Sequence, residues 1–302
     1  KDRQMSEKEM RMLAQKPEIS LSGIASGRFM EQYEEYVSDQ FAGRDTWVRI
    51  KTFADSVAGR TEEGGVFKGK DHYLMEDVAV ADESDLKENL DAMKNFKERY
   101  PDIQMHMMLV PNAANVMEDK LPAFAVTASQ SRQISRVKAE LGDSYDWIDA
   151  EKVLDAHKDE AIYYHTDHHW TTLGAYYGYQ ALSKSMKLDT SKTSDMKPYA
   201  VTNAFNGTLA STSGYETGYD EPIYIYAPDN LKNATEAVVN NVNEKKKTAT
   251  LYDTSKLKGK DKYALFLGGN YPILDIKTTA DSTDRLLIIK DSYANSLIPF
   301  LI

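Results

Sequence analysis

Length, composition and charge set the first limits on this chain. Its 302 residues are 41% hydrophobic and 28% charged, which is ordinary for a globular protein and favours one domain of α/β size with a small appendage. The net charge of −10 argues against nucleic acid as the main partner, because duplex binding needs a cationic surface. The absence of cysteine excludes disulfides, Cys-ligated zinc, iron–sulfur clusters and a thiol nucleophile.

The start of the chain bears on its cellular location. No apolar run reaches the roughly 18 residues needed to span a bilayer. The sequence begins with Lys1 rather than Met, so we expect a signal peptide or an N-terminal anchor to have been removed upstream. A chain without cysteine is compatible with secretion but does not establish it.

The first 75 residues are predicted to form helices and a hairpin. Residues 28–58 show apolar side chains near helical spacing, interrupted at Gly43-Arg44-Asp45, which predicts two amphipathic helices within an N-terminal helical segment, 1–60. Residues 65–75 are typical of a short hairpin that turns at Gly69-Lys70-Asp71.

Helices and strands are then predicted to alternate. The expected elements are a helix capped by Asp82 and ended by Pro101, a strand over 103–110, a helix over 129–141, a strand over 145–148 and a helix over 172–186. This alternation indicates an α/β sheet with helices packed on its faces.

The last third mixes polar and apolar stretches. Residues from about 190 to 260 are rich in Thr, Asn, Asp, Lys and Tyr and are expected to form a β-rich insertion with short strands. The apolar runs 263–267, 273–276 and 285–289 are predicted strands, the last of them central and buried, with a turn at Gly268-Gly269-Asn270. The chain stops ten residues after Ser292, so we expect the native C-terminus to be incomplete here.

The segment 163–171, Tyr-Tyr-His-Thr-Asp-His-His-Trp-Thr, concentrates groups that could carry chemistry. An imidazole is the usual general base near neutral pH, and a carboxylate beside it can hold its tautomer. On an extended loop, Asp167 and His169 would point the same way. The structural alternative is a polar loop that caps the helix at 172, with Trp170 packing in the core.

A metal site is a further alternative for the same segment. It would use His165, Asp167, His168 and His169, and it ranks below the general-base interpretation because the other histidines have no ligand motif around them. We therefore expect no metal and no other cofactor.

Ser292 lies between a predicted strand and a predicted helix start. The free N–H groups and the dipole of a helix N-terminus favour a developing negative charge there. A serine in this position is more often an N-cap, and the surrounding DSYANS lacks the G-x-S-x-G signature. Its pairing with the His-rich loop strengthens the hypothesis, because Ser, His and Asp need be adjacent only in space.

The segment 166–171 resembles the signature of the DHHW protein family, which is similar to the SGNH-like acetylation proteins of bacterial exopolysaccharide systems, including periplasmic alginate O-acetylation proteins. Segments 26–45, 110–112, 205–209, 268–271 and 290–293 extend the resemblance over residues 26–302. It implies one domain, 1–302, with an SGNH-hydrolase-like sandwich around a central, mainly parallel sheet, a permuted motif order and a smaller β-rich insertion.

The same resemblance implies site residues. Ser292 would be the nucleophile, His169 the general base and Asp167 the residue that orients it. Asn270 is similar to the Asn that supplies an oxyanion amide in SGNH hydrolases, although Gly-Gly-Asn is an equally good hairpin turn.

Roles beside this triad are expected to be structural or substrate-facing. We assign His165 and His168 to that class, and we expect Tyr164 and Tyr293 to face substrate. Arg44 is expected to pair with Asp39 or Asp45, since such pairs are usually structural.

The resulting hypothesis is a serine-dependent O-acetyltransferase that acts on a cell-surface polysaccharide. The resemblance implies an extracytoplasmic location, secreted or anchored, and a membrane O-acyltransferase as partner that delivers acyl groups. The alternatives are a carbohydrate acetylesterase, a catalytically inactive carbohydrate-binding or assembly component, and a metal hydrolase.

Overall fold

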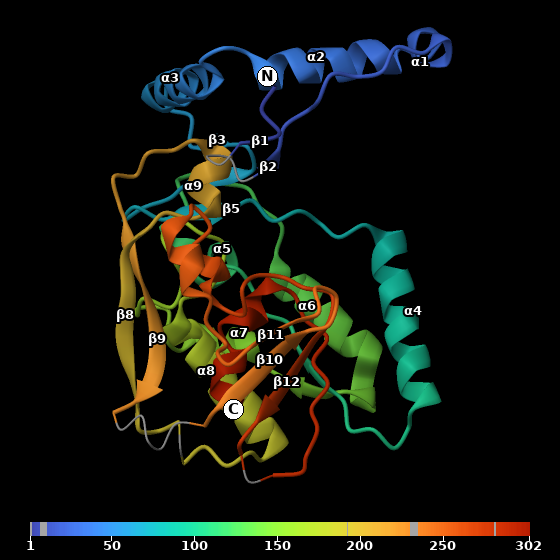
Figure 1. Ribbon diagram of the computed structural model, residues 1–302, viewed down its shortest axis with the longest axis vertical. Coiled ribbons are helices and arrows are strands. Elements are labelled where there is room, and N and C mark those ends of the chain that lie inside the picture. Colours follow the sequence, from blue (N-terminus) through green and yellow to red (C-terminus); the bar gives the residue numbers. More distant parts are fainter. Residues whose placement is uncertain (1, 7–10, 192, 230–234, 281) are drawn as a thin grey trace.

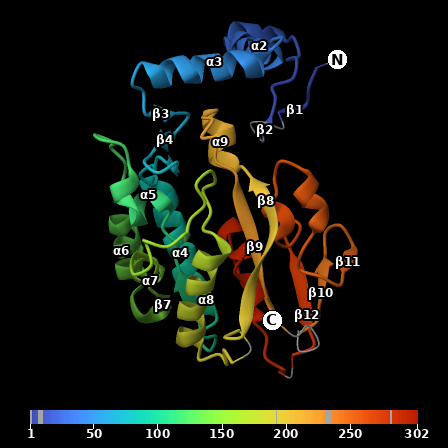
Figure 2. The same cartoon turned by 90° about the vertical axis from the view of Figure 1, so that its left-hand side faces the viewer.

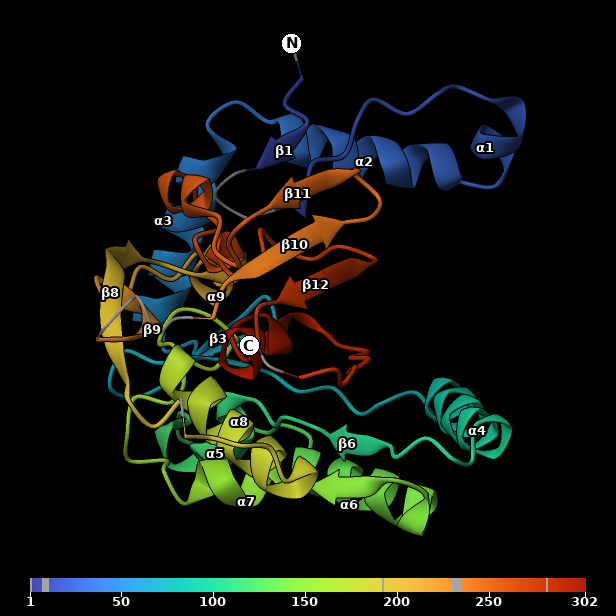
Figure 3. The ribbon, with the colours of Figure 1, turned by 60° about the horizontal axis from the view of Figure 1, so that its bottom comes forward.

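The chain places a helical layer and a small β-sheet on opposite sides of one long hairpin. The structure is a computed structural model, and it describes residues 2–6, 11–191, 193–229, 235–280 and 282–302. Figure 1 shows helices α1–α3 lying across one end of the molecule. Helices α5–α8 lie on one side and strands β10–β12 on the other, and hairpin β8–β9 runs along both (Figures 2 and 3).

The two helices predicted for residues 28–58 are present in the N-terminal segment. Its elements are β1 (Met5–Ser6), β2 (Arg11–Met12), α1 (Leu21–Ala25), α2 (Arg28–Gln40) and α3 (Arg44–Val57). Gly43 has a φ of 70°, a backbone conformation that glycine adopts without strain, and it separates α2 from α3. Asp39 is buried and accepts hydrogen bonds from the Arg11 guanidinium, and its Oδ1 lies 3.6 Å from Nε of Arg44. Arg44 thus has the structural pairing expected of it.

The alternating region also follows the sequence pattern. It contains β3 (Glu62–Glu63), β4 (Val66–Lys68), β5 (Leu74–Glu76), α4 (Glu83–Arg99), β6 (His106–Met108), α5 (Ala113–Val116), η1 (Glu118–Lys120), α6 (Gln130–Leu141), η2 (Gly142–Ser144), β7 (Asp146–Ile148), α7 (Ala150–Asp155) and α8 (Thr172–Met186), where η denotes a 3₁₀-helix. Asp82 caps α4, as predicted, by accepting the N–H groups of Ser84 and Asp85. Strands β6 and β7 are parallel, with α6 in the connection between them.

The region from 190 to 260 is β-rich, as expected, and also carries a helix. Its elements are β8 (Met196–Phe205), α9 (Thr208–Ser213), β9 (Glu221–Pro228), β10 (Ala237–Asn241), β11 (Lys246–Thr248) and η4 (Thr254–Lys258). β8 has ten residues, so the expectation of short strands is wrong for this element. Strand β10 pairs with β11 and with β12 (Leu274–Thr278), and both pairings are antiparallel.

Two predicted strands are corrected by the structure. Tyr263–Leu265 is a 3₁₀-helix, η5, because Asp261 accepts the Ala264 N–H and starts a tight turn. Residues 285–289 are not in a strand, and Leu287 and Ile289 are 78% and 86% exposed. An apolar run predicts that a segment can be buried, but periodicity does not say which element would cover it.

These corrections change the sheet architecture. Over the described residues the strands form five small sheets, and β6–β7 is the parallel pair among them. The structure is therefore a mixed α/β fold, and the central, mainly parallel sheet expected from the resemblance is not formed within these ranges.

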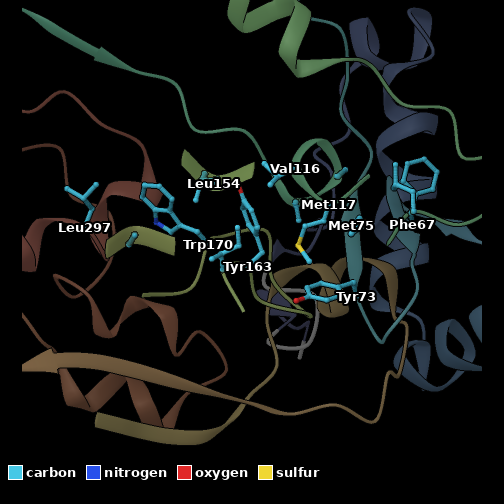
Figure 4. Packing of buried hydrophobic residues seen from close by; sticks show 14 of the residues in the cluster. Phe67, Tyr73, Met75, Val116, Met117, Leu154, Tyr163, Trp170 and Leu297 are labelled. Carbon is cyan, nitrogen blue, oxygen red and sulfur yellow. The ribbon is translucent and has the colours of Figure 1, made fainter. Parts of the chain in front are cut away.

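The main hydrophobic core lies beneath the His-rich loop. Trp170, Tyr163, Leu154 and Leu297 pack together in it, and Figure 4 shows the Trp170 ring between Tyr163 and Leu297. Burying a side chain such as Leu154 fully stabilises the fold by about 2 kcal/mol. The core thus fixes one side of the loop that carries the candidate site. In the part of the chain described, none of the helices combines the length and apolar character needed to cross a membrane.

Candidate active site

The loop 163–171 is closed at its base by backbone pairing. Tyr163 and Trp170 form an antiparallel bridge, and the N–H of Thr171 donates to the carbonyl of Ile162 at 2.9 Å. Residues 165–169 between them are bends, so the loop is not extended as we assumed. Asp167 and His169 meet for another reason: Asp167 Oδ1 accepts both the backbone N–H of His169 (3.0 Å) and its ring Nδ1 (2.6 Å).

Ser292 reaches this loop from a position 123 residues further along the chain. Its Oγ lies 2.7 Å from Nε2 of His169, so the structure brings the three predicted residues into one hydrogen-bonded row. Ser292 is the first residue of η6 (Ser292–Asn295), and Asp291 is the N-cap, accepting the N–H of Tyr293 at 2.9 Å. The N-cap of η6 is therefore Asp291 and not Ser292, so the structural alternative for Ser292 does not apply.

The charge of Asp167 determines which ring nitrogen of His169 donates to it. Burial acts to raise the pKa of Asp167, but the hydrogen bond and charge of His169, with the Thr208 N–H, outweigh it and hold the pKa well below its usual range. An ionised carboxylate only accepts, so His169 Nδ1 carries the proton. In the neutral imidazole, Nε2 then accepts from the Ser292 hydroxyl, which is the arrangement a general base needs.

Thr208 holds the other oxygen of the carboxylate. Its backbone N–H and its hydroxyl donate to Asp167 Oδ2 at 2.8 and 2.9 Å. The hydroxyl oxygen in turn lies 2.6 Å from Nδ1 of His168, which can donate to it. Sequence reasoning placed Thr208 in the block 205–209 but gave it no role, because its hydrogen bonds depend on where α9 begins.

The contact between Thr208 and the Asp167 carboxylate requires a glycine at position 207. A Cβ atom on Gly207 would lie 2.3 Å from Cβ of Asp167 and 2.4 Å from its Oδ2. The backbone before α9 can therefore approach the carboxylate closely only because residue 207 has no side chain.

Two aromatic side chains connect the loop 163–171 to the 3₁₀-helix η6, which carries Ser292. The Trp170 indole N–H donates to the Tyr293 carbonyl (2.9 Å) and lies 3.0 Å from Ser296 Oγ. Tyr263 stacks on the His169 ring with centroids 3.8 Å apart, and its hydroxyl donates to the Ser292 carbonyl at 3.2 Å. Tyr263 was missed because the run 263–267 was interpreted only as a strand.

The remaining predicted residues separate into two groups. His168 and Tyr293 are partly exposed beside Ser292, and the Tyr293 hydroxyl donates to the His168 carbonyl. Burial lowers the pKa of His168, which favours its neutral form. Tyr164, in contrast, is 1% exposed and packs edge-on against Phe205, so our expectation that it faces substrate is not met.

His165 and Asn270 lie at the margin of the site. His165 Nδ1 is 3.0 Å from Glu221 Oε2, and its ring stacks on Tyr73, which fits the structural role. Glu221 also accepts the N–H and hydroxyl of Thr166, a function that sequence reasoning did not find. Asn270 is the last residue of the predicted turn and accepts from Asn295 Nδ2 at 3.0 Å, which places it beside η6.

Asp167, His168 and His169 could also be considered as metal ligands. One ligand atom from each of them lies within 4.8 Å of the others. Both Asp167 oxygens already accept from His169 and Thr208, and both ring nitrogens of His169 are engaged. His165 is bound to Glu221 instead. The hydrogen-bond pattern therefore fits a Ser-His-Asp row better than a set of metal ligands.

Comparison with known proteins identifies the family. The model of the DHHW protein family matches residues 80–302. In this chain the four letters of the family name correspond to Asp167, His168, His169 and Trp170. The chain belongs to the DHHW protein family. No curated protein sequence matches it.

Two solved structures share the fold of this chain, and a third aligns with it more weakly. A DHHW family protein from Eubacterium siraeum is 24% identical with a TM-score of 0.65, and the alignment covers 80% of each chain. Bacillus cereus PatB1 with a sulfonyl adduct is 20% identical with a TM-score of 0.61, over 78% of this chain and 80% of that one. The O-acetyltransferase domain of Pseudomonas putida AlgJ aligns at a TM-score of 0.42 and 19% identity, over 54% of this chain and 63% of that one.

Proposed function

We propose that this DHHW protein is a serine-dependent acyl-transfer enzyme in which Ser292 is the nucleophile, His169 the general base and Asp167 the residue that orients the imidazole. The observation that carries the proposal is the hydrogen-bonded row from Ser292 Oγ through His169 to Asp167, at 2.7 and 2.6 Å. A serine activated in this way attacks carbonyl carbons.

The proposed reaction has two steps. Ser292 Oγ attacks the carbonyl carbon of an acyl donor while His169 Nε2 takes the hydroxyl proton, and the tetrahedral intermediate expels the donor's leaving group, which receives that proton. The acyl-enzyme is then attacked by an acceptor hydroxyl, whose proton passes through His169 back to Ser292 Oγ. The backbone N–H of Ser292 and the amide of Asn270 are our candidates for stabilising the oxyanion.

We assign the acyl group and the acceptor by family resemblance. The proposed acyl group is acetyl, the proposed acceptor is a hydroxyl of a cell-surface polysaccharide, and the partly exposed His168 and Tyr293 would contact it. We further propose an extracytoplasmic location and a membrane O-acyltransferase that delivers the acyl group. The sulfonyl adduct of PatB1 supports the choice of chemistry, because sulfonyl electrophiles modify activated hydroxyl nucleophiles.

Turnover of an aryl acetate by wild type, Ser292→Ala and His169→Gln tests the proposal. We expect wild type to release the aryl alcohol, both variants to lose that activity, and wild-type activity to survive exhaustive chelation. Adding an oligosaccharide acceptor separates transfer from hydrolysis: acetylated sugar supports the transferase, and free acetate alone supports the acetylesterase. Equal turnover by wild type and Ser292→Ala would contradict the proposal.

A further inference from the structure

Three polar side chains form a second hydrogen-bonded row next to Ser292. The Nζ of Lys290 donates to Asn295 Oδ1, and Asn295 Nδ2 donates to Asn270 Oδ1 at 3.0 Å. Asn295 is 1% exposed, while Asn270, at the far end of the row, lies at the surface. The reaction at Ser292, as described above, uses neither Lys290 nor Asn295.

The charge on Lys290 sets the direction of the whole row. An ammonium group only donates, so Asn295 presents its oxygen to Lys290 and its NH₂ group to Asn270. Asn270 must then present its own oxygen to Asn295. The two N–H groups of Asn270 consequently form the outer end of the row.

Helix geometry places this row on the side of the nucleophile. Ser292 and Asn295 are the first and last residues of the 3₁₀-helix η6. A 3₁₀-helix has three residues per turn, so side chains at i and i+3 lie on the same side. The amide of Asn270 is therefore attached, through Asn295, to the face of η6 that carries Ser292.

We propose that Lys290 and Asn295 are positioning residues that orient the Asn270 amide so that its N–H groups stabilise the oxyanion formed at Ser292. This inference rests on the proposed acyl-transfer function. Donors fixed in advance are effective because they need no reorganisation when the negative charge develops. A chain of hydrogen bonds that starts from a cation also polarises the last donor.

The variant Asn295→Asp tests the orientation at constant size. Its carboxylate still accepts from Lys290 but cannot donate, so Asn270 must turn its NH₂ group inward and its oxygen toward the reacting centre. With an aryl acetate we expect kcat to fall about 100-fold while KM changes by less than about twofold, the loss typical of one oxyanion donor. Lys290→Met should lower kcat about tenfold, as for one charged hydrogen bond, and Lys290→Arg should restore most of it.

A double-variant comparison separates orientation from general damage. Asn270→Ala should lower kcat by a similar factor, and Asn295→Asp should add nothing further in the Asn270→Ala background. A multiplicative loss in the double variant, or an unchanged kcat for Asn295→Asp, would overturn the proposal. Melting temperatures identify variants that fold poorly, and Lys290→Met, at a partly exposed position, provides a second test of the row.

A structural measurement keeps this inference separate from the proposed function. If wild type shows no turnover, the acyl-transfer proposal fails, but crystal structures of wild type and Asn295→Asp still reveal the direction of the Asn270 amide from its hydrogen-bond partners. The row predicts opposite orientations in the two proteins. The same orientation in both would overturn it.

Discussion

The indole N–H of Trp170 donates to the backbone carbonyl of Tyr293 at 2.9 Å. This hydrogen bond joins the loop that carries His169 to the turn that carries Ser292, 123 residues away. Trp170 is also part of the main core, so the two halves of the proposed active site are aligned by the packing of the fold itself.

Replacing Trp170 by Phe should therefore affect both stability and activity. The smaller phenyl ring leaves a cavity in the main core, and the Tyr293 carbonyl and the Ser296 hydroxyl lose a donor, so we expect a loss of about 1–3 kcal/mol in the free energy of unfolding. Aryl acetate turnover should fall as well, because Ser292 is held less firmly. Denaturant unfolding with Trp47→Phe as control, at a 60% exposed position, measures the first effect. Equal stability of the two variants would contradict the role given to Trp170.

Thr208 should matter through its hydroxyl. Thr208→Val keeps the shape and the backbone N–H but removes the donor to Asp167 Oδ2 and the acceptor for His168. We expect kcat to fall about tenfold, as for one hydrogen bond to a charged group. The control is Thr208→Ser, which keeps the hydroxyl and should retain most of the activity. Similar rates for the Val and Ser variants would show that the hydroxyl has no part in holding Asp167.

Gly207→Ala should damage the site by steric contact. The added methyl would lie 2.3 Å from Cβ of Asp167, so either α9 or the loop must move, and we expect a loss of about 1–3 kcal/mol together with strongly reduced turnover. Gly259→Ala is a suitable control, because the nearest atom there is at an ordinary 3.6 Å. Wild-type melting temperature and turnover in Gly207→Ala would refute the close approach.

The buried carboxylate of Asp39 should make stability depend on acidity. The Arg11 hydrogen bond is the main cause that lowers its pKa to about 2, against the opposing effect of burial. Because the pKa is lowered on folding, the stabilisation is complete above the unfolded value of about 3.9 and is lost as the pH falls through the folded value. In urea unfolding between roughly pH 2 and pH 6, the advantage of wild type over Asp39→Asn should shrink toward acid. A stability difference between wild type and Asp39→Asn that stays constant with pH would contradict this prediction.

The sequence predicted local elements better than their assembly. Helices with a capping residue and a breaker, such as the one from Asp82 to Pro101, were predicted well because those signals are local. The run 285–289 was misassigned because its burial depends on a covering partner, and the run 263–267 because an apolar stretch alone does not distinguish a strand from a tight helical turn.

The candidate site was also predicted only in part. Asp167, His169 and Ser292 were selected by residue type and by family resemblance, and the structure places them in one row. Thr208 and Tyr263 were not selected, because a threonine or tyrosine carries no chemical signature until the chain brings it to an imidazole or a carboxylate. Their roles depend on tertiary contacts between distant segments.

Covalent labelling of Ser292 tests the central claim most directly. The protein is treated with an aryl sulfonyl fluoride, and the modified residue is located by peptide mass spectrometry. The row from Asp167 to Ser292 predicts one rapidly modified hydroxyl, at Ser292, with labelling abolished in Ser292→Ala and greatly slowed in His169→Gln. Failure of wild type to react, or reaction at an unchanged rate in His169→Gln, would contradict the account.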